Sequence, residues 1–353
     1  MTNSIYTIKH KQKQTKVYYA ELAKAVNLSK IIKTDKKNIL LIYDKQLEGL
    51  RPFKKLKQQA ALSYCLEAGE PLKKLSQFVH HFSALNKKYS NQVTRQTHIV
   101  SVGGGSVGDF VGFLASVWKR GLGLTHIPST WLAAVDSAHG GKTALNIDFG
   151  KNQLGSFYCA SQIVIIKNIL QSSSLESAYG EIFKMAFLRK ALFSKLKNTP
   201  YPSASLIWRL LPKLIQGKYF YIQKDPLETT GQRMYLNLGH TIAHILELQF
   251  SIPHGAAVIL GLDFSLNWSL RKKLISKPIF QPYSEALKPL VKQWRKEVKT
   301  LSKTKAVKLL LQDKKINNKN SIHFVFFTSK GYAIKPTPLK SLITELQRAN
   351  YIK

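Results

Sequence analysis

The sequence predicts an α/β domain built on a parallel sheet, followed by a mainly α-helical domain. In the first half of the 353 residues, short apolar runs alternate with stretches of helical periodicity, as in parallel α/β folds. From about Leu170 onward, apolar residues recur mostly at helical spacing. We therefore expect one domain over residues 1–165 and a second over 166–353, each long enough to bury a core.

Each predicted element depends on a local pattern. Residues 38–43 form a continuous apolar run, which is typical of a buried parallel strand, and a weaker signal at 17–19 suggests an edge strand. A strand and a turn are predicted within 63–69, and further strands at 99–102, 122–127 and 163–166, with helices over 72–89 and 110–118. In the second domain, helices are predicted over 174–189, 203–216, 241–250, 256–268, 284–299 and 339–349, with a strand or hairpin at 321–327.

A glycine-rich segment follows the strand at 99–102. Gly103, Gly105 and Gly108 have the G-x-G-x-x-G spacing and lead into a helix, an arrangement that offers backbone N–H groups to a phosphate. The alternative is a plain tight turn. Two more glycine-rich stretches, 135–143 and 150–155, favour ligand binding, and we expect them to be turns that approach a ligand closely. The first domain is therefore predicted to be Rossmann-like.

Asp44 directly follows the apolar run at 38–43. An acid at the carboxyl end of such a strand lies where α/β sheets bind their ligands. No acid lies about 20 residues after the glycine loop, where a dinucleotide fold usually has its ribose partner. Asp44 is a candidate for that role, and a simple turn residue is the alternative.

Charge and composition restrict the class of protein to which this chain can belong. Lys and Arg number 54 against 19 Asp and Glu, a net charge of +35, which attracts polyanions and also small phosphorylated acids. The basic residues are spread along the chain, so no dedicated nucleic-acid binding is predicted. Cys65 and Cys159 suggest no disulfide framework, and no apolar run approaches the ~18 residues of a membrane span. Because the N-terminus also lacks a signal-peptide core, we expect a cytoplasmic protein without membrane partners.

Titratable clusters lie in the second domain. Glu181 and Lys184 stand at i and i+3, which is most often a solvated ion pair. His240, His244 and Glu247 share one face of a helix, and His254 follows shortly after it. This pattern fits a metal site. The alternative is core histidines whose hydrogen bonds are satisfied by the backbone. Spacing alone leaves open which three residues would bind a metal ion.

Several cations have no obvious acidic partner in the sequence. A single lysine is usually solvated, but Lys142 and Lys151 lie in the glycine-rich stretches, beside Asp136 and Asn152. A nucleotide loop, a metal site and anion-binding cations together predict redox chemistry on a small phosphorylated acid. The cations are Arg120, Lys142, Lys151, Lys184, Lys218 and Arg233.

From about Asp44 to Lys315, the chain resembles the 3-dehydroquinate synthase family of NAD-dependent sugar phosphate cyclases. Its long motifs occur in the same order as in that family, which makes a chance match implausible. They are Gly103-Gly-Gly-Ser-Val-Gly-Asp109, Pro128-Ser-Thr130, Asp136-Ser-Ala-His-Gly-Gly-Lys-Thr143, Gly150-Lys-Asn152, Glu181-Ile-Phe-Lys184, Gly231-Gln-Arg233, Asn237-Leu-Gly-His-Thr-Ile-Ala-His244, His254-Gly255 and Asp313-Lys-Lys315.

The resemblance implies roles for individual residues. The metal, Zn²⁺ or alternatively Co²⁺, would be bound by Glu181, His240 and His254, with His244 facing the substrate instead. NAD contacts are implied for Asp44, Glu70, Lys73, Gly103, Gly104, Gly105, Asp109, Ser129, Thr130, Asp136, Lys142 and Lys151. Catalytic and substrate roles are implied for Lys142, Asn152, Lys184, Lys218, Arg233, Asn237, His244 and one of Lys314 and Lys315. Arg120 matches a residue that family homodimers offer to the substrate phosphate across the subunit interface.

The implied activity is that of a phosphate-eliminating carbon–oxygen lyase of the shikimate pathway, which leads to aromatic amino acids. Its substrate is 3-deoxy-D-arabino-heptulosonate 7-phosphate, a phosphorylated sugar acid. The C5 hydroxyl is oxidised transiently by NAD⁺, phosphate is eliminated, the hydride returns, and an intramolecular aldol reaction closes the ring. A metal with an open position polarises the hydroxyl.

Some positions depart from the family pattern. Acids are usual where this chain has Ala256, Lys167 and Arg189, and one extra residue lies between Asp225 and Gly231. Alternative functions are a sibling cyclase of the inosose or valiolone type, a metal-dependent polyol dehydrogenase, and a basic nucleic-acid-binding protein that keeps only the fold.

Overall fold

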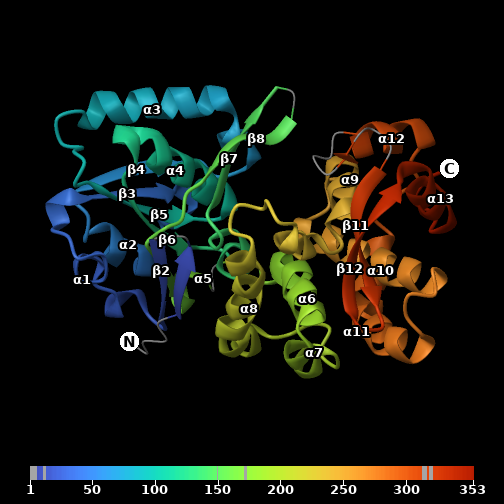
Figure 1. The fold of residues 1–353 in the computed structure, drawn as a ribbon. Coiled ribbons are helices and arrows are strands. Elements are labelled where there is room, and N and C mark those ends of the chain that lie inside the picture. The colour runs from blue at the N-terminus through green and yellow to red at the C-terminus, as the bar shows by residue number, and fades with distance from the viewer. Residues whose placement is uncertain (1–5, 11–12, 149, 171–172, 312–315, 318–320) are drawn as a thin grey trace. The chain divides into compact units, whose positions relative to one another are not determined.

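The computed structural model describes residues 6–10, 13–148, 150–170, 173–311, 316–317 and 321–353 (Figure 1). The chain divides into two compact units, Met1–Leu175 and Glu176–Lys353. We expected the division near residue 165. The last strand of the first unit is instead followed by a short helix, α5 (Lys167–Leu170), which belongs to that unit.

A seven-stranded sheet forms the centre of the first unit, in the order β1-β2-β9-β6-β5-β3-β4. All neighbouring pairs are parallel except β1 and β2, which are antiparallel. The predicted edge strand at 17–19 lies within β2, and this position was wrong because β1 pairs along its outer side. The strands are β1 (Tyr6–His10), β2 (Lys13–Ala20), β3 (Ile39–Asp44), β4 (Leu62–Leu66), β5 (His98–Gly103), β6 (Gly123–Pro128) and β9 (Gln162–Ile166).

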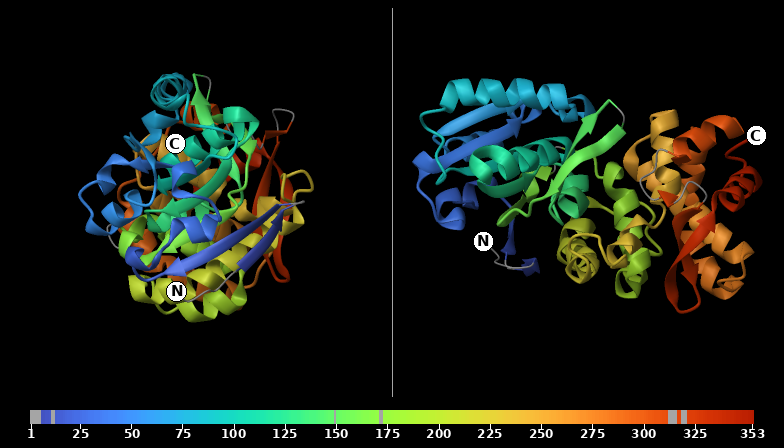
Figure 2. Two further views of the ribbon diagram at one scale, coloured as in Figure 1. Left: turned by 90° about the vertical axis from the view of Figure 1, so that its left-hand side faces the viewer. Right: turned by 45° about the horizontal axis from the view of Figure 1, so that its top comes forward.

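Helices cover both faces of this sheet, as Figures 1 and 2 show. All six residues of β3 are buried, which explains its uninterrupted apolar sequence. Ile39, Leu41 and Tyr43 pack in one core cluster with Phe53 and Leu56 of α2. The strand's alternation turns its remaining residues toward the opposite face. The helices are α1 (Leu28–Ile32), α2 (Arg51–Lys57), α3 (Leu75–Tyr89), α4 (Gly105–Val117) and α5.

The order of the strands reverses between β3 and β5. The chain leaves β3 for β4 on one side, and leaves β5 for β6 on the other. Such a reversal opens a crevice at the carboxyl ends of the two strands, where α/β sheets bind ligands. Tyr43 is paired with Val102, so Asp44 and Gly103 end their strands side by side.

A β-hairpin occupies part of the glycine-rich region that was expected to be turns. Strand β7 (Lys142–Ile147) pairs antiparallel with β8 (Gly150–Phe157), so Lys142 and Lys151 lie in strands. The prediction was wrong because a glycine here lets two strands pack closely and does not form a turn. A Cβ on Gly155 would lie 2.5 Å from the Thr143 carbonyl oxygen. The backbones therefore approach where a side chain would separate them.

The second unit is mainly helical and confirms the predicted helices, with shifted ends. Helix α10 is its centre and packs against α6, α9, α11 and β11. The predictions did not include α7, α12, β10 and β12. The helices are α6 (Tyr179–Leu188), α7 (Lys190–Leu196), α8 (Ala204–Lys224), α9 (His240–Phe250), α10 (His254–Arg271), α11 (Lys277–Arg295), α12 (Lys303–Leu311) and α13 (Leu339–Arg348). The strands are β10 (Ile316–Asn317), β11 (Ser321–Thr328) and β12 (Gly331–Pro338).

Among the described helices of either unit, none combines the length and the apolarity that a membrane crossing requires. Both cysteines are free thiols, as their isolation in the sequence predicted.

Candidate functional site

The first group of candidate residues lies at the strand-order reversal of the first unit. Asp44 is 6% exposed, and its Oδ1 accepts a hydrogen bond from the Gln46 N–H at 3.1 Å. Burial raises the pKa of Asp44, although backbone hydrogen bonds from Gln46 and Ala68 oppose this. The carboxylate thus ends β3 beside the glycine loop.

The glycine loop connects β5 to the start of α4 at Gly105. A Cβ on Gly103 would lie 2.6 Å from the Val107 Cβ, and one on Gly104 would lie 3.2 Å from the Thr130 Cγ2. The close packing excludes side chains here, so the loop presents bare backbone at the N-terminus of α4. Such a terminus favours a phosphate group.

Lys73 joins two parts of the first unit that the sequence did not connect. It lies in the 3₁₀ turn η4 (Glu70–Lys73), is 5% exposed, and its Nζ lies 2.6 Å from Asp109 Oδ2. The same Nζ donates to Asn152 Oδ1 on β8. Burial raises the pKa of Asp109, and the Lys73 charge opposes that rise. One buried ammonium therefore bridges a predicted NAD residue and a predicted substrate residue.

Asn146 holds the hairpin to the same turn. Its Nδ2 donates to Glu70 Oε1 at 2.6 Å, and its Oδ1 accepts the Asn152 N–H at 2.8 Å. Asn152 has a φ of 55°, a left-handed conformation that asparagine tolerates better than most residues. The sequence gives no signal for the contact between Asn146 and Glu70, because the two residues lie 76 positions apart.

The second group lies in the second unit, where α6, α9 and α10 each contribute one residue. Ligand atoms of Glu181, His240 and His254 all lie within 4.8 Å of one another. The Nε2 atoms of both histidines are 3.1 Å from Glu181 Oε1. Glu181 is fully buried, so its carboxylate is held among these groups and Lys184, with which it forms an ion pair. The expectation of a solvated Glu181–Lys184 pair was wrong, because α6 is buried along its length.

Glycines next to these residues allow the three helices to approach closely. A Cβ on Gly180 would lie 2.5 Å from the Gly255 carbonyl oxygen, where α6 meets α10. A Cβ on Gly261 of α10 would overlap the carbonyl of Gly239, which precedes α9. Each candidate ligand therefore has a glycine as its sequence neighbour at a helix contact, and the backbones converge there.

Electrostatics distinguish the two histidines. Burial, assisted by the nearby Lys184 charge, lowers the pKa of His240 to about 4, so its ring is neutral. Burial also opposes charge on His254, but hydrogen bonds to Glu181 and Glu247 outweigh it and raise the pKa of His254 to about 10. The Glu181 carboxyl is buried as well, yet the Lys184 charge and the hydrogen bonds from His240 and His254 bring its pKa well below the ordinary range. The cluster thus concentrates one carboxylate among cations.

The helical stripe of His240, His244 and Glu247 divides in the structure. His240 joins the cluster, whereas Glu247 contacts the other ring nitrogen of His254, with Oε1 at 3.0 Å from Nδ1. His244 is one helical turn beyond His240, their ring centroids 5.8 Å apart. Spacing alone had left these combinations open.

Arg233 is held by a loop that follows α8. The fully buried Asp225 accepts three backbone hydrogen bonds, from Thr229 at 2.7 Å, Thr230 at 3.0 Å and Arg233 at 3.1 Å. The Arg233 guanidinium donates to the Pro226 carbonyl at 2.9 Å. Burial opposes ionisation of Asp225, but the backbone hydrogen bonds lower its pKa overall.

The chain is similar to known proteins both in sequence and in fold. Two family models match in succession, 3-dehydroquinate synthase N-terminal over residues 63–179 and 3-dehydroquinate synthase C-terminal over residues 178–316. A 3-dehydroquinate synthase of Staphylococcus epidermidis is 32% identical over 326 residues, which cover 87% of this chain and 88% of that protein.

The chain belongs to the 3-dehydroquinate synthase family. Its fold is also similar to a solved 2-deoxy-scyllo-inosose synthase in complex with carbaglucose-6-phosphate, NAD⁺ and Co²⁺, with a TM-score of 0.81 at 21% identity, covering 98% of this chain and 100% of that one. A 2-epi-5-epi-valiolone synthase from Streptomyces hygroscopicus, with NAD⁺ and Zn²⁺ bound, gives a TM-score of 0.76 at 19% identity, covering 97% and 99%. These similarities confirm the predicted family and fold class.

Most family positions fall on ordered elements. Lys218 is 5% exposed on α8 and Lys184 is 2% exposed on α6, so neither is the solvated surface lysine that the sequence alone favoured. Lys142 and Lys151 are exposed on the hairpin.

Other family positions lie in turns or outside the described residues. Asp136 lies in a short π-helical turn at Ala133–Ser137, and Asn237 ends the 3₁₀ turn η8 (Gln232–Asn237). Lys314 and Lys315 lie outside the described residues.

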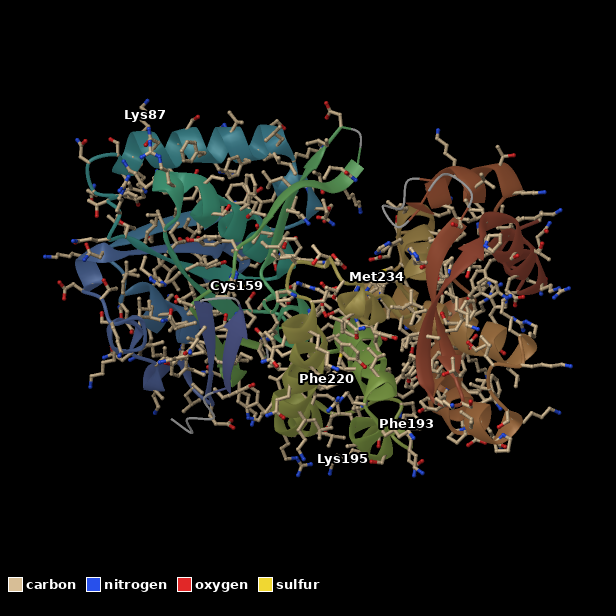
Figure 3. All side chains as sticks on the ribbon, viewed as in Figure 1. Lys87, Cys159, Phe193, Lys195, Phe220 and Met234 are labelled. Carbon is tan, nitrogen blue, oxygen red and sulfur yellow. The ribbon has the colours of Figure 1, made fainter. Side chains whose placement is uncertain are left out.

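The three residues that differ in type from the 3-dehydroquinate synthase pattern make ordinary contacts with their neighbours. Lys167 forms an ion pair with Glu21 at 2.8 Å. The Arg189 guanidinium lies 4.6 Å from the ring centroid of Phe220, which is labelled in Figure 3. Ala256 is 2% exposed and lies in the first turn of α10, where the helix dipole would stabilise an acidic side chain. None of the three lies among the donor atoms of the Glu181 cluster.

Proposed function

We propose that this chain is an active 3-dehydroquinate synthase of the shikimate pathway. It would convert 3-deoxy-D-arabino-heptulosonate 7-phosphate into 3-dehydroquinate and phosphate. The observation that carries the proposal is the buried donor set of Glu181, His240 and His254, in a chain that belongs to this family. One carboxylate and two imidazoles are a typical three-residue set for a catalytic zinc ion with an open position.

The donor set fits a divalent cation on the chemistry of its atoms. The two Nε2 atoms and the Glu181 carboxylate face one another, and Glu181 is fully buried. We propose Zn²⁺, with Co²⁺ as an alternative that suits the same ligands. A bound Zn²⁺ would act as a Lewis acid toward the substrate hydroxyl.

The first unit would hold NAD at the strand-order reversal. Asp44 would accept hydrogen bonds from a ribose, and the pyrophosphate would lie at the N-terminus of α4, beside the glycine loop. Lys73 and Asp109 form the ion pair described above, and Glu70, Ser129, Thr130, Asp136, Lys142 and Lys151 complete the proposed set. Bound NAD⁺ would supply the transient hydride acceptor of the reaction.

The polar residues of the second unit would bind and orient the substrate. Arg233 is held by Pro226 and Asp225, and its planar guanidinium suits a carboxylate. Lys184 and Lys218 offer buried positive charge for a departing phosphate. His244 would move protons at the reacting carbon, since an imidazole side chain can serve as a general acid or base. Asn237, Lys142 and Asn152 would donate hydrogen bonds to hydroxyl groups, and one of Lys314 and Lys315 is proposed as a further contact.

We also propose a homodimer in which Arg120 contacts the substrate phosphate of the partner. Lys119, Arg120 and Gly121 have φ values of 51°, 67° and 116° in succession. A positive φ costs conformational energy in a residue other than glycine, so two such residues in succession, Lys119 and Arg120, are usually retained for a function. The adjacent Val117 is 47% exposed, as an apolar residue at a subunit contact would be in an isolated chain.

The proposal is tested by measuring phosphate release with NAD⁺ and Zn²⁺ present. We expect release from the heptulosonate phosphate without net NADH. Release from sedoheptulose 7-phosphate or glucose 6-phosphate instead would indicate a sibling cyclase, and net NADH would indicate a polyol dehydrogenase. Duplex DNA binding that persists at high salt, without phosphate release, would favour the nucleic-acid-binding alternative.

A further inference from the structure

Glu247 and His254 are brought together by a short connection between two helices. Helix α9 ends at Phe250, Ser251 has a φ of 52°, and α10 begins at His254. Ile252 is 8% exposed, so the connection is anchored in the core. The last turn of α9 therefore lies directly beside the first residue of α10, and Glu247 meets the His254 ring.

The two nitrogens of the His254 ring have different partners. Glu247 Oε1 is 3.0 Å from Nδ1, whereas Glu181 Oε1 is 3.1 Å from Nε2. An acceptor behind Nδ1 keeps the proton on that nitrogen, so that Nε2 can offer its lone pair to a metal. The contact also fixes the rotation of the ring.

His240 has the same arrangement with a different acceptor. Its Nδ1 lies 3.2 Å from the Leu238 carbonyl oxygen, and its Nε2 lies 3.1 Å from Glu181. Both histidines therefore direct Nε2 toward Glu181 and have an acceptor behind the ring. For His240 that acceptor is main chain, which no substitution removes, whereas for His254 it is a side chain.

We propose that Glu247 is a positioning residue for the metal centre, which holds His254 through Nδ1 so that Nε2 faces the metal. The inference depends on the metal site proposed at Glu181, His240 and His254. Glu247 lies on the far side of the imidazole from Glu181, so it acts through His254 and is not itself a metal ligand.

The test measures the metal affinity of the whole chain. A chelator first removes any bound metal. Zn²⁺ and Co²⁺ are titrated in competition with a chromophoric chelator. Loss of such an orienting partner typically weakens metal binding about 10- to 100-fold, and we expect this for E247A. E247Q keeps an amide oxygen that accepts a hydrogen bond from Nδ1–H, but more weakly than a carboxylate, so we expect a smaller yet measurable loss, at most about tenfold. The Co²⁺ absorption spectrum of E247A should also change, because the His254 ring is free to rotate.

E285A is the matched control. Glu285 is an exposed acid on α11 that accepts a hydrogen bond from Gln281, and its removal should leave metal affinity unchanged. Unchanged affinity in E247A, or equal losses in E247Q and E247A, would overturn the positioning role. If E247A fails to fold, E247Q decides, and unaltered affinity in E247Q then overturns it. Absence of metal binding by the unmodified protein would instead overturn the proposed metal centre.

Discussion

His254 Nε2 lies 3.1 Å from Glu181 Oε1, although the two residues are 73 positions apart in the sequence. The contact joins the first residue of α10 to the buried carboxylate of α6. Together with His240, these atoms form the three-residue donor set from which the proposed metal chemistry follows.

Removal of His254 tests this donor set directly. We expect H254A to lose tight metal binding and turnover together, because two remaining ligands hold a divalent cation poorly. Metal content after dialysis and the rate of phosphate release measure the two effects. Full activity in metal-free H254A would refute the site.

Lys142 lies on the hairpin of the first unit and is not among the donor atoms. We expect K142A to retain its metal while turnover falls about 100-fold, the usual scale for loss of one well-placed catalytic group. Metal analysis and kcat are measured on the same preparation. A K142A enzyme with normal kcat would remove Lys142 from the catalytic set.

The contact between Gly180 and Gly255 is expected to control the geometry of the metal centre. A Cβ at Gly180 would meet the Gly255 carbonyl oxygen at 2.5 Å, so G180A should force α6 and α10 apart. We expect a loss of stability of about 1–3 kcal/mol, despite the better helix propensity of alanine, together with weaker Zn²⁺ binding.

The matched control for this change is G49A. A Cβ on Gly49 would meet nothing within 4 Å, so its stability and metal affinity should be unaltered. Urea unfolding and chelator competition measure both variants. If G180A behaved like G49A, the helix contact would have no influence on the ligands.

Asp225 is expected to stabilise the loop that carries Arg233. D225N replaces a carboxylate that accepts three backbone N–H groups, and we expect a cost of about 2 kcal/mol at pH 7 and a raised KM. The pKa of Asp225 is lowered from 3.8 in the folded state, so its charge stabilises the fold at pH values above that. The contribution is lost as the pH falls through the folded-state pKa.

Urea unfolding at several pH values checks this expectation. The difference in stability between the unmodified protein and D225N should be constant near neutral pH and shrink below about pH 4. A difference that persisted unchanged at pH 2.5, or a raised KM without loss of stability, would contradict the role given to the carboxylate.

The sequence predicted most strands of the central sheet in the first unit because they carry local signals, whereas the short helices α1, α2 and α5 were not predicted. The run ending at Asp44 is apolar because both faces of β3 are covered. The first glycine of the loop, Gly103, lies against Val107, only four residues further along the chain. The hairpin β7–β8 was missed because its glycines resemble turn residues, and Asn146 because its partner Glu70 lies 76 positions away.

By itself, then, the sequence determined the α/β and helical units, the glycine loop, and the family through its ordered motifs. Only the tertiary structure decided how the titratable residues are grouped. It separated His240 from the rest of its helical stripe, placed Glu247 behind His254, and buried Lys73 between Asp109 and Asn152. The physical reason is that helical periodicity specifies a face, whereas a ligand set requires distances between faces. Those distances arise where α6, α9 and α10 pack closely at glycines.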